Sequence, residues 1–263
     1  MTFAPPADAL NQGHDTLWGN LGDWSHASEY VEAAAALARR LGEAAGLGAG
    51  QHVVDLGPGG GDQLRMWVEA FGVERVTAVE LDPDLAGRAS ERVKVWGLDS
   101  RIRLVVGEAT TASWTDTPAD RVVALDSAYF FASREAFLRR CASALRPGCV
   151  LAVTDLLQGE GAPARLARAV APLFGVPVDG VLTEARYRAL LTEHGFDDIV
   201  VRYCTDEVLG GFSRWIQGGG HRRRPALPRT TRLGLSITGL AAGFLARPTG
   251  LRYVVTTARR RSA

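Results

Sequence analysis

One turn of the chain carries the residues best suited to hold a small ligand. The apolar run from His52 to Leu56 contains Asp55 and is followed by Gly57-Pro58-Gly59-Gly60-Gly61 and Asp62. Glycine lets the backbone approach a ligand closely, and the start of a helix offers unpaired N–H groups at the positive end of its dipole. The pattern therefore predicts a cofactor site at this turn, with Asp55 bracing it.

Two classes of cofactor use a turn of this kind. A dinucleotide requires G-x-G-x-x-G, but the third glycine position, counted from Gly57, is Asp62, whose carboxylate would repel a pyrophosphate. The pattern acid-Leu-Gly-x-Gly-x-Gly instead resembles the first motif of class I S-adenosylmethionine (SAM)-dependent methyltransferases of the small-molecule, natural-product type. The resemblance implies a cofactor that has no phosphate and carries a cationic sulfonium. It makes an NAD(P)-linked oxidoreductase the less favoured alternative.

The elements that must position this turn alternate between strand and helix. Strands are expected at 52–56, 75–80, 101–106, 121–125, 150–154, 199–203 and 251–257, and helices at 28–47, 63–71, 84–96, 134–145, 164–174 and 184–194. Continuous apolar strands alternating with helices indicate an α/β fold with a mostly parallel sheet that is covered on both faces. We expect a doubly wound, Rossmann-like sheet of seven strands with an antiparallel last strand and a helical cap.

Acidic residues stand at the ends of the next three predicted strands, where such sheets bind ligands. Glu80 lies nineteen residues after Gly61 and is expected to bind the ribose hydroxyls. The family resemblance places Leu81, Glu108 and Ala109 at the adenine and Asp126 nearest the methyl group. The predicted cofactor-binding residues are Asp55, Gly57, Gly59, Gly61, Glu80, Leu81, Glu108, Ala109 and Asp126.

The N-terminal segment Leu17–Trp24 (LWGNLGDW) resembles the stretch that folds over cofactor and acceptor in small-molecule methyltransferases. Trp18 and Trp24 are therefore predicted to bind substrate, with the alternative that they pin the N-terminus to the core. Tyr30 is predicted either to reach the cofactor's carboxylate end or to pack its helix. We expect cap elements at 14–30, 159–180 and 205–250.

The general base is not evident from the sequence. Related natural-product enzymes place a histidine four residues after the acid of the fourth strand, but Phe130 stands there, which puts base-catalysed O-methylation by that route in doubt. Tyr129 and, second, His14 are the predicted catalytic residues, and Phe130 is a predicted substrate contact. We expect chemistry that needs no metal, because no metal-binding triad is evident.

Charge is distributed unevenly along the chain. No acid follows Glu207, whereas eleven arginines do, so the formal charge of +1 leaves −10 on the first 207 residues. Arg222 and Arg223 are predicted to bind a phosphorylated substrate. The alternatives are that they hold the protein to an anionic lipid surface, or that they are solvated against the acidic body. Nucleic acid is not an expected partner, because no basic groove interleaved with aromatics is visible.

The sequence predicts one domain over residues 1–263 that transfers a methyl group from SAM to a small, largely apolar metabolite of secondary metabolism. The alternatives are C-methylation of a prenyl diphosphate, with or without cyclisation, and a SAM-binding module without activity. Three cysteines without C-x-x-C spacing, no signal-peptide pattern and a longest apolar run of 14 residues predict a cytoplasmic protein. Contact with a membrane surface and self-association into a homo-oligomer are left open.

Overall fold

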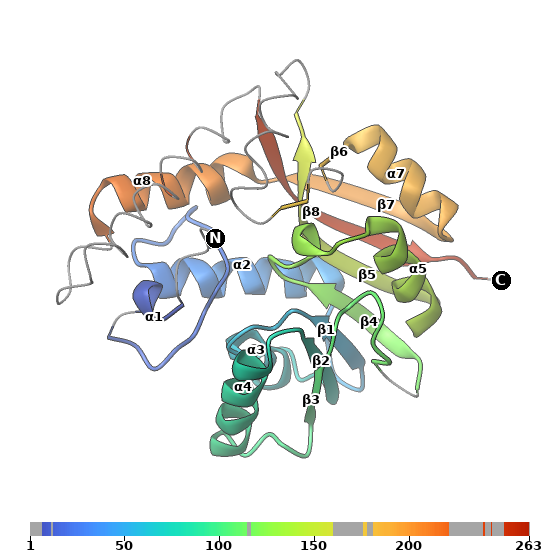
Figure 1. Ribbon diagram of the computed structural model, residues 1–263, viewed down its shortest axis with the longest axis horizontal. Helices are drawn as coiled ribbons and strands as arrows, with labels where there is room; N and C mark the ends of the chain where they lie inside the picture. Colours follow the sequence, from blue (N-terminus) through green and yellow to red (C-terminus); the bar gives the residue numbers. More distant parts are fainter. Residues whose placement is uncertain are drawn as a thin grey trace.

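A twisted sheet runs through the centre of the molecule, with helices on both of its faces (Figure 1). The computed structural model describes residues 7–11, 13–114, 117–159, 176–177, 181–220, 239, 243 and 250–262. The strands are β1 (His52–Leu56), β2 (Arg75–Glu80), β3 (Ile102–Val106), β4 (Ala119–Ala124), β5 (Leu145–Gln158), β6 (Leu182–Thr183), β7 (Phe196–Tyr203) and β8 (Leu251–Arg260). The α-helices are α1 (Ala7–Leu10), α2 (Tyr30–Ala45), α3 (Asp62–Glu69), α4 (Pro83–Val95), α5 (Arg134–Ala144), α7 (Glu184–Glu193) and α8 (Gly211–Gln217).

The strand order is β3-β2-β1-β4-β5-β8-β7, and β6 pairs with β5. All pairs are parallel except those of β8, which is antiparallel to both β5 and β7. The predicted doubly wound, mostly parallel sheet with an antiparallel last strand is confirmed, and the two-residue β6 adds an eighth strand that was not expected. The strand order reverses between β1 and β4, which is the point where such sheets bind ligands.

Alternate residues of the central strands serve two separate cores. Val53 on β1 belongs to the core under α2, α3 and α4, whereas Val54 belongs to the core under α5 and α7. Every residue of β1 is buried, because helices cover the sheet on both sides. This double cover explains why the strand is continuously apolar apart from His52 and Asp55.

Local sequence signals explain where the helices next to the ligand-binding edge begin and end. The Asp82 side chain accepts hydrogen bonds from the backbone N–H groups of Asp84 and Leu85 at 2.8 and 3.2 Å, and Pro83 opens α4. Helix α2 ends at Gly46, which adopts the left-handed conformation with φ 62°. These signals place the helix boundaries within two residues of the predicted ones.

Strand β5 and helix α8 differ most from the prediction. Strand β5 extends far beyond the predicted 150–154, because β4 and β8 pair with it on its two sides and provide hydrogen-bond partners for its backbone N–H and C=O groups. Helix α8 lies within the predicted cap segment 205–250, directly after a π-helical turn, η4 (Asp206–Gly210). Its Gly211 packs so closely that an added Cβ would lie 2.3 Å from the Cβ of Trp24.

Candidate active site

A cavity of about 620 Å³ opens at the carboxyl ends of β1, β2, β3 and β4. Residues from five different parts of the chain meet there. They are Gly19, Asn20, Gly57, Pro58, Gly59, Gln63, Val79, Glu80, Leu81, Leu85, Gly107, Glu108, Ala109, Leu125, Asp126, Ser127, Phe130, Phe131 and Ala132. The cavity therefore contains most of the predicted cofactor-binding residues.

The glycine turn forms the wall of the cavity after β1. Gly59 has φ +56°, and no atom lies within 4 Å of an added Cβ, so this position opens onto free space beside a ligand. Gly57 has φ +77° and packs against Ser127, whose Cβ would lie 2.5 Å from an added Cβ. Gly61, at the start of α3, faces Ala89 of α4 and is not among the lining residues.

Glu80 lies at the end of β2 and connects this turn to the next strand. Its Oε2 accepts a hydrogen bond from the backbone N–H of Gly59 at 2.9 Å, and its Oε1 accepts one from Asp82 at 3.0 Å. The side chain is buried but lines the cavity. A carboxylate has about four lone-pair sites, so Glu80 can accept further bonds from a ligand.

The residues after β2 and β3 supply a more apolar wall. Leu81, directly after β2, lines the cavity although it is 66% exposed, and Ala109, after β3, lines it with a buried side chain. The Glu108 carboxylate accepts hydrogen bonds from the hydroxyls of Thr110 and Thr111 at 2.5 and 3.3 Å. This part of the cavity offers an apolar surface beside a held carboxylate, which suits a flat heterocycle that carries an amino group.

The charge of the lining is entirely negative. Glu80, Glu108 and Asp126 are its ionisable side chains, and among the described residues no lysine, arginine or histidine contributes to it. A diphosphate would lie against three carboxylates without a cation, whereas a cationic sulfonium would be attracted. The lining therefore fits a sulfonium nucleoside and not a dinucleotide.

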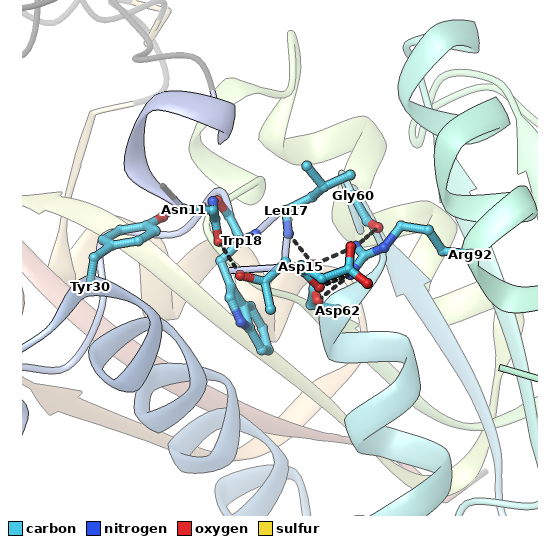
Figure 2. A network of polar contacts seen from close by, with 9 residues as sticks. Asn11, Asp15, Leu17, Trp18, Tyr30, Gly60, Asp62 and Arg92 are labelled. Atoms are coloured by element: carbon cyan, nitrogen blue, oxygen red, sulfur yellow. Dashed lines mark hydrogen bonds and ion pairs between the residues drawn. The ribbon is translucent and has the colours of Figure 1, made fainter. Parts of the chain in front are cut away.

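Asp62, whose charge was expected to repel a pyrophosphate, has a different role in the structure. Figure 2 shows its carboxylate paired with Arg92 of α4 and accepting the backbone N–H of Leu17. Both N–O distances to Arg92 are 2.7 Å, and the hydrogen bond from Leu17 is also 2.7 Å long. Arg92 also donates to the carbonyl of Gly60. The charge of Asp62 is thus neutralised, and this residue anchors the N-terminal segment over the glycine turn.

Asp55 lies beneath the turn and outside the cavity lining. It is fully buried and accepts a hydrogen bond from the indole N–H of Trp67 at 2.6 Å. Burial raises the pKa of this carboxyl to about 7, the hydrogen bond from Trp67 opposing the shift. These contacts agree with the expected bracing role.

The N-terminal segment crosses the cavity and contributes Gly19 and Asn20 to its lining. The Tyr30 hydroxyl donates toward the carbonyls of Trp18 and Asn20 at 3.1 and 2.7 Å, and Asn11 bonds both backbone groups of Trp18 (Figure 2). Tyr30 is buried and is not among the lining residues. Through these hydrogen bonds Tyr30 holds the segment in place.

The two tryptophans of this segment lie away from the cavity. Trp18 is buried in the core under α2. The ring of Trp24 packs on α8, with centroids 5.2 Å from Trp215 and 6.5 Å from Phe212. Of the two alternatives in the sequence analysis, these positions agree with pinning the N-terminus to the core.

Asp126 lies at one end of the cavity, after β4, and Glu108 lies at the other end, after β3. Its Oδ2 accepts a hydrogen bond from the backbone N–H of Leu21 at 2.6 Å, and its Oδ1 accepts one from the hydroxyl of Tyr253 on β8. Burial raises the pKa of Asp126 above its ordinary value, although these donors oppose the shift. Sequence reasoning missed Tyr253, because no local motif marks a residue in the last strand.

The short 3-10 helix η1 (Ala128–Phe130) follows Asp126 and forms an aromatic rim. Phe130 is 43% exposed and lines the cavity with Phe131, whereas Tyr129 is buried behind Phe130 with ring centroids 4.5 Å apart. His14 is exposed and lines a separate hollow beside Arg88 and Arg92. Neither of the two predicted catalytic residues, Tyr129 and His14, is among the lining residues of the cofactor cavity, although Tyr129 lies directly behind Phe130.

Other predictions concern segments that the structure does not describe. Arg222 and Arg223 lie outside the described residues, as do most of the cap elements 159–180 and 205–250. Within the described ranges, no helix combines the length and apolar character needed to cross a bilayer. In the same ranges, no three His, Cys, Asp or Glu side chains come together as a metal site.

Comparisons with known proteins identify the family. A family model described as a methyltransferase domain matches residues 53–148. The erythromycin 3''-O-methyltransferase of Saccharopolyspora erythraea is 32% identical over 216 residues, covering 79% of this chain and 70% of that protein. The 27-O-demethylrifamycin SV methyltransferase of Amycolatopsis mediterranei is 29% identical over 263 residues, covering 96% and 94%.

Solved structures support the same fold. The cyclopropane synthase MmaA2 from Mycobacterium tuberculosis superposes with a TM-score of 0.76 at 16% identity, covering 97% of each chain. At this identity the likeness concerns the fold alone. With the sequence matches and the acidic cavity at the strand ends, it shows that this chain belongs to the class I SAM-dependent methyltransferases, enzymes that use SAM as the methyl donor for small molecules.

Proposed function

We propose that this chain transfers the methyl group of SAM to a hydroxyl oxygen of a small, largely apolar natural product. The observation that carries the proposal is the two-ended cavity, which has carboxylates and Leu81 at the ends of β2 and β3 and an aromatic rim of Phe130 and Phe131 after β4. The printed names of two relatives support the choice of acceptor, since both act on natural products and one is an O-methyltransferase.

The residues of the acidic end would hold the cofactor. Glu80 would accept hydrogen bonds from the ribose hydroxyls, while Leu81, Glu108 and Ala109 would border the adenine. The open position at Gly59 would admit the methionine portion, with Gly57 and Gly61 shaping the turn and Asp55 bracing it. SAM supplies a methyl group bound to a cationic sulfur, which the negative lining would attract.

The other end would hold the acceptor. Gly19 and Asn20 would cover it, and Phe130 and Phe131 would contact its apolar body. Trp18, Trp24 and Tyr30 would act on substrate binding indirectly, by holding the N-terminal segment closed over the site. In-line methyl transfer depends mainly on placing acceptor, methyl group and sulfur on one axis in a dry site, which such a cover favours.

The proposal is tested by incubating the purified protein with isotope-labelled SAM and two panels of compounds, one of hydroxyl-bearing macrolides and one of small amines. We expect label in a macrolide as an O-methyl group, identified by mass spectrometry and NMR. Label only in amines, or in no compound although SAM binds, would contradict the proposal. Methylation of a prenyl diphosphate stays a prediction that depends on Arg222 and Arg223.

A further inference from the structure

The acceptor end of the cavity contains one ionisable side chain among the described residues. Asp126 lies there, after β4, whereas Glu80 and Glu108 lie at the ends of β2 and β3 on the other side of β1. The neighbouring hydroxyl of Ser127 is bound to the carbonyl of Leu56 at 2.5 Å. No histidine of the described residues lines the cavity, so a proton leaving the acceptor has one nearby carboxylate to go to.

The geometry of Asp126 leaves room for one more hydrogen bond. The backbone N–H of Leu21 donates to Oδ2, and the hydroxyl of Tyr253 donates to Oδ1. A carboxylate offers about four lone-pair sites, so these two donors orient the group and leave room for an acceptor hydroxyl. The backbone of Asp126 has φ 50°, and its N–H donates to the Thr154 hydroxyl at 2.7 Å. Each carboxylate oxygen is therefore held by one donor, and the backbone of the residue is fixed as well.

The titratable groups around Asp126 influence how readily it accepts a proton. The titratable groups that face it are the phenols Tyr30 from α2, Tyr129 from η1 and Tyr253 from β8, all buried. Among the described residues, none of the ion pairs involves Asp126. Burial without a cationic partner raises the pKa of a carboxyl and makes it a better proton acceptor.

We propose that Asp126 accepts the proton of the acceptor hydroxyl during O-methylation, and that Tyr253 is a positioning residue that orients this carboxylate. The inference rests on the proposed function. As the acceptor oxygen forms the new C–O bond, the C–S bond breaks and its electron pair stays on sulfur. The hydroxyl proton moves to the carboxylate, so the positive charge of the sulfonium and the negative charge of Asp126 disappear together.

The first test needs no acceptor. The proton uptake that accompanies binding of SAM and of S-adenosylhomocysteine is measured by calorimetry in buffers of different ionisation enthalpy. The sulfonium stabilises a neighbouring carboxylate, so the neutral S-adenosylhomocysteine should leave Asp126 more protonated and take up more protons. We expect this difference in proton uptake in the wild type and its loss in Asp126→Asn. Protons taken up by the ligands' own amino groups contribute equally in both proteins, so comparison with the variant removes them. Equal differences in both proteins would overturn the proposal.

The second test measures methyl transfer to the compound that the wild type is found to methylate. Asp126→Asn keeps an oxygen that can accept from Leu21 but removes the base, so kcat should fall about 100-fold or more while the SAM dissociation constant changes less than about threefold. An Asp126→Asn variant as active as the wild type would overturn this inference and leave the proposed function intact. A wild type that methylates no hydroxyl would overturn the proposed function, and this inference with it.

Tyr253→Phe provides a milder variant. Loss of its hydrogen bond should raise the pKa of Asp126 and move the acid limb of the kcat profile to higher pH, with the fold kept. Tyr187→Phe is the matched control, because Tyr187 is equally buried but belongs to the core on the other face of the sheet. A shift of the acid limb in Tyr187→Phe of the same size, or none in Tyr253→Phe, would overturn the positioning role.

Discussion

The two ends of the cavity are built in different ways. At the nucleoside end, polar contacts join residues that are near in the chain, such as Gly59 with Glu80, 21 residues apart, and Glu108 with Thr110, two residues apart. At the acceptor end, Asp126 is held by Leu21, 105 residues away, and by Tyr253, 127 residues away. The first end is a property of β1 to β3 and the turns that follow them, whereas the second forms only when three distant segments meet.

This difference teaches that the two ends should respond differently to mutation. Changes at the nucleoside end should act on cofactor binding or on local stability, because their partners lie close in sequence. Changes to the contacts of the N-terminal segment should open the acceptor end and leave the nucleoside end largely formed. The following variants test this separation.

The largest expected effect is a pH-dependent change in stability at Asp55. Its pKa is raised to about 7 in the folded protein, so the folded state retains a proton that the unfolded state has lost. The contribution of Asp55 to the free energy of unfolding of the wild type should therefore decrease as the pH rises from about 4 to about 7. The decrease is at most about 4 kcal/mol. Asp55→Asn lacks this titration. In chemical denaturation, the free energy of unfolding of the variant should therefore increase relative to that of the wild type as the pH rises. A constant difference across that range would contradict the prediction.

Glu80→Gln should have the next largest effect, because it removes the charge expected to bind the ribose. Loss of charged hydrogen bonds of this kind weakens binding by about 2 to 3 kcal/mol, or roughly 30- to 150-fold in the SAM dissociation constant. Calorimetry measures the change. Glu135→Gln is the control, since its side chain is 63% exposed on α5 and should leave binding unchanged. Undiminished affinity in Glu80→Gln would refute the ribose assignment.

Asp62→Asn should loosen the N-terminal segment. The Asp62–Arg92 pair is mostly buried, with side-chain exposures of 8% and 16%, so its loss should cost about 2 kcal/mol. We expect limited proteolysis to cut faster within residues 13–24, and methyl transfer to fall more than SAM affinity. The variant Arg65→Gln, which breaks an exposed pair with Glu69, should show neither change. Equal losses of transfer and affinity would show that the two ends are not separable.

Tyr30→Phe should have the smallest effect. It removes the hydroxyl that donates toward the Trp18 and Asn20 carbonyls, for an expected loss of about 1 to 2 kcal/mol in the free energy of unfolding. The KM for the acceptor should rise a few-fold, because Asn20 lines the cavity. SAM affinity measured by calorimetry should stay within about twofold. A larger loss of SAM affinity would favour the alternative that Tyr30 reaches the cofactor.

Particular residues show how far prediction from the sequence reached. The apolar strands end at Glu80 and just before Glu108 and Asp126, and parallel strands bring such ends to one edge, so the sequence predicted that these three acids lie together. The family resemblance placed Trp18 and Trp24 at the substrate, with pinning of the N-terminus to the core as the alternative, and their packing on α2 and α8 agrees with the alternative. No helix was predicted at the adjacent glycines Gly210 and Gly211, yet α8 begins at Gly211, which packs closely against Trp24.

The sequence by itself determined the alternation of strands and helices, the glycine turn and the acidic strand ends, because each depends on periodicity or on neighbours within a few residues. Only the tertiary structure decided that Asp62 is neutralised by Arg92 and that Tyr253 holds Asp126. Contacts between residues far apart in the chain depend on how β8 and the N-terminal segment pack against β4 and β5. Local patterns of side chains carry no information on that packing, which the burial of the whole sheet determines.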